Sequence, residues 1–139
     1  MGLNDTISAA INKNAPAVSG EESLRNVIDT MARANVSALV VKDGNEVMGL
    51  ITTMDVMNCV AKGRDLGQTK VAGSMTPCSL ITGQGGKRTP CVQLDEAETI
   101  GNALAIMNEA GVHNLLVSGA NNQAIGTVSV LDLLKLAIA

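Results

Sequence analysis

Two stretches of the chain share one pattern, and this duplication restricts the fold more than any other feature. The pattern is a glycine, two largely apolar residues, a hydroxyl residue, two further residues and an aspartate, and it occurs as GLITTMD and as GTVSVLD. In each copy an apolar strand end runs into a helix through the hydroxyl residue, Thr52 or Ser129. A carboxylate follows three positions later, at Asp55 or Asp132.

The duplication extends over most of the chain. Apolar residues spaced i, i+3, i+4, i+7 from Leu24 predict an amphipathic helix that Asn35 ends. Two strands, at 38–41 and 47–51, and a second helix follow. The same order returns about 76 residues later, and it finishes in a helix over 130–139 that is apolar nearly all round. Such a helix needs a cover, either the other repeat or a second copy of the protein.

The sequence therefore predicts an α/β (α+β) fold with two repeats related by a pseudo-twofold axis, each a small sheet with two packed helices. Leu3, Ile7 and Ile11, at spacing i, i+4, i+8, predict a short additional N-terminal helix. We expect four parts: the N-terminal helix at 1–13, the first repeat at 14–66, a linker with a glycine-rich loop at 67–89, and the second repeat at 90–139.

The composition limits the partners. Phe, Tyr and Trp are absent, so the core must be aliphatic, and a flat ligand would be held by aliphatic walls. The net charge is −3, and no basic cluster is longer than Lys87-Arg88, which argues against a nucleic-acid partner. Four methionines at helical spacing are predicted to fill the core. They are Met31, Met54, Met57 and Met107.

The cysteines and the hydropathy indicate the cellular compartment of the protein. Cys59, Cys78 and Cys91 are odd in number and have no Cys-x-x-Cys spacing, so we expect free thiols in a reducing compartment. No apolar run approaches the ~20 residues that cross a bilayer, and the first residues have no signal-peptide pattern. These features predict a cytoplasmic protein without a membrane segment.

The linker contains three glycines beside two cations, Lys87 and Arg88. This arrangement invites comparison with a phosphate-binding loop, but the spacing does not match that motif or the dinucleotide-binding motif. A solvated loop is the favoured interpretation. In the alternative, the two cations close over a bound phosphate.

The paired motifs, the repeated order of elements and the linker segment VAGSMTP together resemble a tandem CBS (cystathionine beta-synthase) domain pair, also called a Bateman module, from about residue 14 to 139. The linker is longer than usual before the second extended segment at 90–94, and the N-terminal helix is extra. The resemblance implies a regulatory module for energy or metabolite sensing. Such modules bind AMP, ADP, ATP or S-adenosylmethionine in clefts between the repeats and act on a regulated protein, here unidentified, through a conformational change.

The resemblance also assigns ligand contacts. Each family site combines the hydroxyl and aspartate of one repeat with the first extended segment and the second-strand start of the other. One cleft would use Thr52, Asp55, Thr89, Val92 and Val112. The other would use Ser129, Asp132, Ala15, Ala17, Val36 and Ser37, with His113 as a contact near the phosphates.

The motif has a second interpretation. A carboxylate in the first helical turn can accept both cis-hydroxyls of a ribose, and the helix N-terminus favours a phosphate. The same spacing is typical of a capping box, which only stabilises the helix. A single histidine, with no metal-ligand cluster and no nucleophile-base pair, argues against an enzyme. A ligand-free dimerisation or scaffold module is the alternative function, because apolar terminal helices would explain a homodimer.

Overall fold

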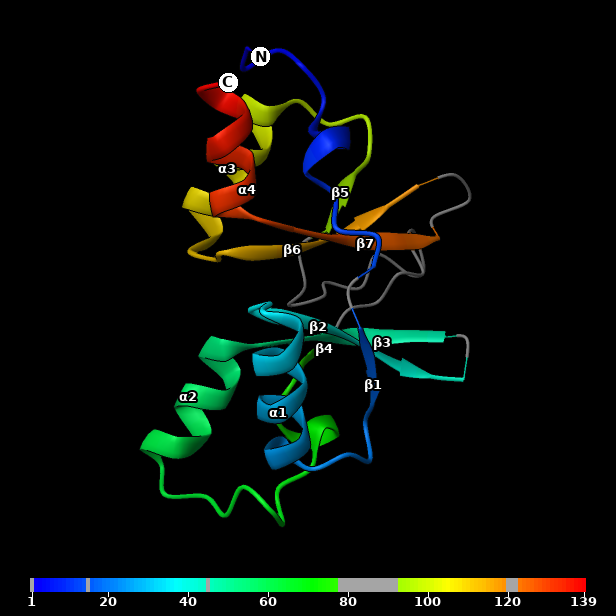
Figure 1. Cartoon of the computed structure of the whole chain (residues 1–139), viewed down its shortest axis with the longest axis vertical. Coiled ribbons are helices and arrows are strands. Elements are labelled where there is room, and N and C mark those ends of the chain that lie inside the picture. The colour runs from blue at the N-terminus through cyan, green and yellow to red at the C-terminus, as the bar shows by residue number, and fades with distance from the viewer. Residues whose placement is uncertain (1, 15, 45, 78–92, 120–122) are drawn as a thin grey trace. The chain divides into compact units, whose positions relative to one another are not determined.

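Each repeat forms its own sheet and pair of helices in the computed structural model (Figure 1), which describes residues 2–14, 16–44, 46–77, 93–119 and 123–139. The first-repeat unit is Ala15–Cys91. The second-repeat unit joins Met1–Asn14 to Val92–Ala139, so it is discontinuous in sequence. The predicted mixed fold of two similar repeats is confirmed.

The first-repeat unit has a four-stranded sheet in the order β1-β2-β3-β4. Strand β1 is parallel to β2, with α1 as the crossover between them, and the other neighbours are antiparallel. The elements are β1 (Ala17–Ser19), α1 (Leu24–Ala34), β2 (Ala38–Asp43), β3 (Glu46–Thr52), α2 (Thr53–Ala61), the 3₁₀ turn η2 (Val71–Gly73) and β4 (Thr76–Pro77).

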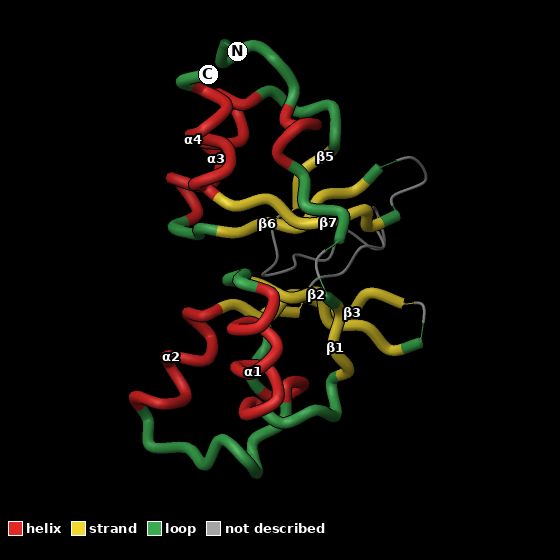
Figure 2. The backbone as a smooth tube through the Cα atoms, in the orientation of Figure 1, coloured by secondary structure: helices red, strands yellow, loops and turns green. Residues whose placement is uncertain are grey.

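Helix α1 shows how the sequence sets these boundaries. Ser23 caps its N-terminus by accepting a hydrogen bond from the Asn26 N–H at 3.2 Å. Asn35 ends it, as predicted, and adopts the left-handed conformation with φ of 55°. Its buried residues, Leu24 and Val27 among them, pack with those of α2 against the sheet, and the two helices lie on the same face of that sheet (Figure 2).

The second-repeat unit repeats this plan with a three-stranded sheet in the order β5-β6-β7. Its antiparallel pair begins at the equivalent position, since Asn114 pairs with Ser129 as Ala38 pairs with Thr52. Both pairs also contain an irregularity at the equivalent point. The elements are β5 (Gln93–Asp95), α3 (Ile100–Ala110), β6 (Asn114–Ser118), β7 (Ala124–Ser129) and α4 (Val130–Ala137).

The N-terminal segment differs from its prediction. It forms only the 3₁₀ turn η1 (Ile7–Ala10), and extended backbone on either side pairs with the second-repeat unit. Asn12 exchanges two backbone hydrogen bonds with Thr127 on the edge of β7, at 2.8 and 3.1 Å (Figure 1). Ile7 is fully buried in that unit's core. The predicted short helix is therefore present only at Ile7–Ala10, because backbone groups on either side of it bond to the rest of the unit instead of to one another.

The segment containing η2 is the first-repeat equivalent of this N-terminal segment. Val71 is fully buried like Ile7, and each donates its N–H to the loop before the first helix of its unit at 2.9 Å. Thr76 lies opposite Leu50 on β3 as Asn12 lies opposite Thr127 on β7. The N-terminal segment is thus a duplicated part of the repeat, and it completes the repeat that comes later in the chain.

The methionine prediction is half right. Met31 and Met107 are buried in the two cores, whereas Met54 and Met57 are exposed. Helix α2 turns Val56 and Cys59 toward the core, which leaves these two methionines on its outer face. Cys59 is a free thiol, and Cys78 and Cys91 lie outside the described residues. In the described part of the chain, no helix has the length and apolarity needed to cross a bilayer.

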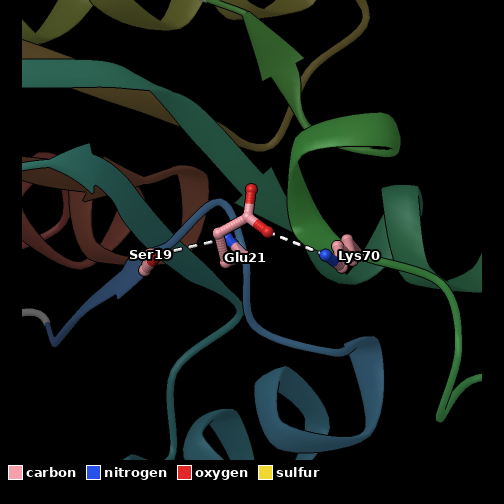
Figure 3. Close-up of polar contacts among 3 residues, drawn as sticks. All are labelled: Ser19, Glu21 and Lys70. Carbon is pink, nitrogen blue, oxygen red and sulfur yellow. Dashed lines mark hydrogen bonds and ion pairs between the residues drawn. The ribbon is translucent and has the colours of Figure 1, made fainter.

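An ion pair ties the loop after β1 to the segment before η2. The Lys70 Nζ donates to the Glu21 Oε1 at 2.8 Å, and the Ser19 hydroxyl accepts from the Glu21 N–H (Figure 3). The hydrogen bond and the opposite charge hold the pKa of Glu21 below its ordinary value and the pKa of Lys70 above its own. Both side chains are exposed, so the contribution to stability is small.

We predict a definite pH window for this pair. The Glu21 contribution is present above the unfolded pKa of its carboxyl and is lost as the pH falls through the lower folded pKa. The Lys70 contribution is present below the unfolded pKa of its amine and is lost as the pH rises through the higher folded pKa. An NMR titration should show the pKa of Glu21 rising toward its ordinary value in Lys70→Met. An unchanged Glu21 pKa in that variant would contradict the assignment.

Candidate functional site

The first motif forms a complete capping box at the start of α2. The Thr52 hydroxyl accepts a hydrogen bond from the Asp55 N–H at 3.3 Å. In return the Asp55 Oδ2 accepts from the Thr52 N–H at 2.9 Å. The first motif therefore caps the start of α2.

Thr76 adds a contact that the motif did not predict. Its hydroxyl donates to the Asp55 Oδ1 at 3.3 Å, so both carboxylate oxygens already have a donor. Strand β4 places Thr76 there by pairing with β3. The linker segment that contains Thr76 was noticed in the sequence only as a family feature. Its pairing with β3 joins distant parts of the chain, which a local pattern does not report.

In the second motif, fewer hydrogen bonds reach the carboxylate, that of Asp132, than reach the carboxylate of Asp55 in the first. The Ser129 hydroxyl accepts from the Asp132 N–H at 3.2 Å and lies 3.0 Å from the Asp132 Oδ2. Within the described ranges, the contact of the Asp132 Oδ1 is with the exposed Lys135 Nζ, at 3.9 Å. Asp132 therefore keeps more hydrogen-bond acceptor capacity for a ligand than Asp55 does.

The predicted residues at the second-strand starts lie beside the motifs of their own repeats. The Ser37 carbonyl accepts from the Thr53 N–H, and the His113 carbonyl accepts from the Val130 N–H, both at 3.0 Å. Each bond fixes the first residue of a motif helix against the start of the neighbouring strand. The Ser37 and His113 side chains are exposed.

Each unit has a groove between its two helices. The α1–α2 groove encloses about 570 Å³ and has an almost wholly apolar lining that includes Val36. The α3–α4 groove encloses about 370 Å³, and its lining includes Val112 together with two polar side chains, Asn108 and His113. The equivalent grooves therefore differ in size and polarity.

A third cavity lies beside Asp55. It encloses about 170 Å³, and its polar lining includes Asn58, Lys62, Arg64 and Ser74. Pockets for drug-sized ligands enclose about 300–1,000 Å³, so this cavity is large enough for only part of a nucleotide.

The remaining predicted ligand contacts either are exposed away from the grooves or lie outside the described residues. Ala17 is exposed on β1, which pairs with β2. Ala15, Thr89, Val92 and the glycine-rich loop lie outside the described residues. Within the described ranges, no three His, Cys, Asp or Glu side chains come together as a set that could hold a metal ion.

Known proteins share this architecture. The family model for the CBS domain matches residues 7–62 and 87–139. An uncharacterized protein of Methanocaldococcus jannaschii is 28% identical over 114 residues, which are 82% of this chain and 24% of that protein. The chain thus spans about a quarter of the length of that curated relative.

Two solved structures show the same fold. An uncharacterized conserved protein of Pyrococcus horikoshii has a TM-score of 0.84 at 20% identity, over 100% of this chain and 96% of the other. The CBS domain of a bacterial CNNM/CorC family Mg²⁺ transporter, in complex with ATP, has a TM-score of 0.73 at 14% identity, over 98% of this chain and 89% of the other.

Proposed function

Because the chain belongs to the CBS-domain family and carries two copies of the domain, we propose that it is a regulatory module that binds an adenosine-type nucleotide. The candidate ligands are AMP, ADP, ATP and S-adenosylmethionine. The module acts as a homodimer on a regulated protein that is not yet identified, and ligand binding changes its conformation.

The observation that carries this proposal is the repeated placement of a carboxylate in the first turn of a helix, at Asp55 and Asp132. The free N–H groups at such a helix start attract a phosphate, and a carboxylate beside them can accept ribose hydroxyls. The Asp132 side chain is half-exposed and its carboxylate has fewer donors than that of Asp55, which makes the motif at Ser129 the stronger candidate of the two. The transporter CBS domain that was solved with ATP supports the choice of ligand class.

A scaffold without a ligand is the second candidate. The complete capping box at Thr52 favours it, because a carboxylate that caps its own helix has a structural role already. The exposed apolar side chains of α2 and α4 favour it as well, since they would explain a dimer.

Thermal unfolding in the presence of each candidate at millimolar concentration separates the two functions. A ligand that binds only the folded state stabilises it by about 2.7 kcal/mol at a hundred times its Kd, so the midpoint temperature should rise. Midpoints that are unchanged by every adenosine compound, NAD included, would leave the scaffold as the function. Calorimetric titration would then give the number of sites.

One pair of variants, with a control pair, tests whether the motifs bind a nucleotide or only cap their helices. We expect Asp55→Ala and Asp132→Ala to cost about 1 kcal/mol of stability each as lost helix caps. Each should also weaken nucleotide binding about tenfold to a hundredfold, because charge-assisted hydrogen bonds to the ligand are lost. Urea unfolding and calorimetry measure the two effects separately.

The chain offers matched controls. Ser23 and Thr99 cap α1 and α3 in the same way, each accepting from an N–H three residues later at 3.2 Å, but neither belongs to the motif. Alanine at either position should reduce stability by a similar amount and leave binding unchanged. If Asp55→Ala and Asp132→Ala behave like these controls, the two motifs are caps only.

A further inference from the structure

The cavity beside Asp55 lies between a flank of α2 and the turn η2, and its described lining residues all belong to the first-repeat unit. Its volume of about 170 Å³ has room for about five water molecules, since one water occupies about 30 Å³. A single phosphate or sulfate group is of this size. We call this space, which Lys62, Arg64, Gly73 and Ser74 help to line, the α2 cavity.

The end of α2 brings two cations, Lys62 and Arg64, into this lining. The residue between them, Gly63, has the left-handed conformation, with φ of 74°. Its N–H bonds to the Val60 carbonyl and the Arg64 N–H bonds to the Cys59 carbonyl, both at 3.0 Å, so the helix ends in a Schellman motif. The chain turns back at the glycine, and the residues on both sides of it therefore line one cavity.

The charge of the lining is positive. Among the described residues, neither Lys62 nor Arg64 has an acidic partner within ion-pair distance. The described carboxylate in the lining is that of Asp55, and its two oxygens already accept hydrogen bonds, from the Thr52 N–H and the Thr76 hydroxyl. Two cations against one occupied carboxylate leave an excess of one positive charge.

The neutral side chains of the lining add hydrogen-bond donors. The Cys59 Sγ donates to the Ser74 Oγ at 3.2 Å, which leaves the serine O–H available to donate. Asn58, one helical turn before Lys62, contributes an amide. An occupant must therefore accept hydrogen bonds and carry negative charge. Arginine and lysine both bind phosphate, the first through a planar fork of donors and the second as a point charge.

We propose that the α2 cavity binds a phosphoryl group, either as inorganic phosphate or as the phosphate of a larger ester. Lys62 and Arg64 neutralise its charge, and the Ser74 hydroxyl and the Asn58 amide donate to its oxygens. The inference goes beyond the proposed nucleotide function, because none of these four residues is a nucleotide contact that the resemblance assigns. The site lies inside one unit, so it requires no particular arrangement of the two units.

NMR titration of the full chain with sodium phosphate tests the site, with sodium chloride used to hold the ionic strength constant. We expect saturable shifts of the amide signals of Arg64, Gly73 and Ser74. The double variant Lys62→Gln/Arg64→Gln should bind phosphate at least tenfold more weakly, because charge-assisted hydrogen bonds are lost. Shifts that do not saturate, or that spread evenly over the exposed lysines, would overturn the proposal.

A second double variant, Arg33→Gln/Lys42→Gln, is the matched control. Both residues are exposed in the same unit and lie outside the cavity, and Arg33 is also in the last turn of its helix. The same charge is removed, yet phosphate affinity should stay at the wild-type value. An equal loss in both double variants would mean unspecific attraction. Wild-type affinity in both would mean that Lys62 and Arg64 serve only the end of α2.

Gly73→Glu tests the cavity while both cations stay in place. Among the described residues, its chain neighbours aside, no atom lies within 4 Å of a Cβ at this position, so the variant should fold, as circular dichroism can check. The added carboxylate should abolish phosphate binding by repulsion, whereas Gly73→Ala should retain it. Wild-type phosphate affinity in Gly73→Glu would place the anion elsewhere and overturn the proposal.

Titrations with AMP and adenosine identify the source of the phosphoryl group. If it belongs to a nucleotide, Lys62→Gln/Arg64→Gln weakens the binding of AMP and leaves that of adenosine unchanged. If it is free phosphate, neither changes. Phosphate binding at this site stands even if no adenosine compound binds. Nucleotide binding without a response to phosphate, and without an effect of the double variant, would overturn this inference alone.

Discussion

Replacing Ile7 by alanine is expected to lower the free energy of unfolding by about 3 kcal/mol, because truncating a fully buried isoleucine costs about 2–5 kcal/mol. The side chain belongs to the core cluster that α3, α4 and the sheet of this unit also form, although it lies more than 80 residues before them in sequence. The loss should appear in the second-repeat unit, whose core the residue joins.

Urea unfolding followed by circular dichroism measures the total loss, and hydrogen exchange shows which unit opens. Leu3→Ala is the control from the same segment, since Leu3 is exposed and its truncation should change stability by less than about 1 kcal/mol. Equal effects at both positions would mean that the N-terminal segment is not part of the core. Faster exchange in the first-repeat unit alone would contradict the assignment of Ile7.

Gly126→Ala is expected to be about as damaging. A Cβ at this position would lie within 2.9 Å of the Ile11 side chain and much closer still to the backbone oxygen of Asn12. A backbone oxygen cannot turn aside like a flexible side chain, so the N-terminal segment must move away from β7. Overpacking of this kind costs about 1–3 kcal/mol, and the two hydrogen bonds between Asn12 and Thr127 would be strained as well.

Gly73→Ala provides the comparison, because among the described residues, its two chain neighbours aside, no atom lies within 4 Å of a Cβ at that position. We expect a change within about 0.5 kcal/mol for this control. Thermal unfolding of both variants should therefore show a lowered midpoint only for Gly126→Ala. A wild-type midpoint in that variant would mean that the segment before Asn12 does not need to lie against β7.

The sequence predicted those elements whose boundaries are coded locally. Helix α1 was predicted from its apolar residues at helical spacing and from Asn35 as its end, and both features occur, with Ser23 as the N-terminal cap. The duplication then carried this assignment to α3, where Thr99 is the cap and Gly111 ends the helix with φ of 70°. Repetition made the fold predictable because one well-marked unit defined the other.

The N-terminal segment could not be predicted in the same way. Leu3, Ile7 and Ile11 have helical spacing, but a segment that packs through Ile7 and Ile11 and pairs through Asn12 has similar apolar positions in sequence. What decides their structure is the edge of β7, more than a hundred residues away. Met54 and Met57 were misjudged for a related reason, since spacing does not tell which face of a short helix meets the core.

The sequence predicted where the residues of the candidate site lie, but not which hydrogen bonds they make. The sequence placed Thr52, Asp55, Ser129 and Asp132 at two helix starts, where the structure has them. It did not predict that Thr76 shares the carboxylate of Asp55, nor that the two carboxylates differ in their remaining acceptor capacity. Both differences arise from neighbours outside the motif.

The pairing of Asn12 with Thr127 also has a consequence for the order of folding during synthesis. The segment around Asn12 leaves the ribosome before the strand that receives it, which is made about 115 residues later, a delay of roughly 6–23 s at 5–20 residues per second. The first-repeat unit, which is continuous in sequence, can be complete before then. The segment around Asn12 therefore waits for its native partner until after the first-repeat unit has been made.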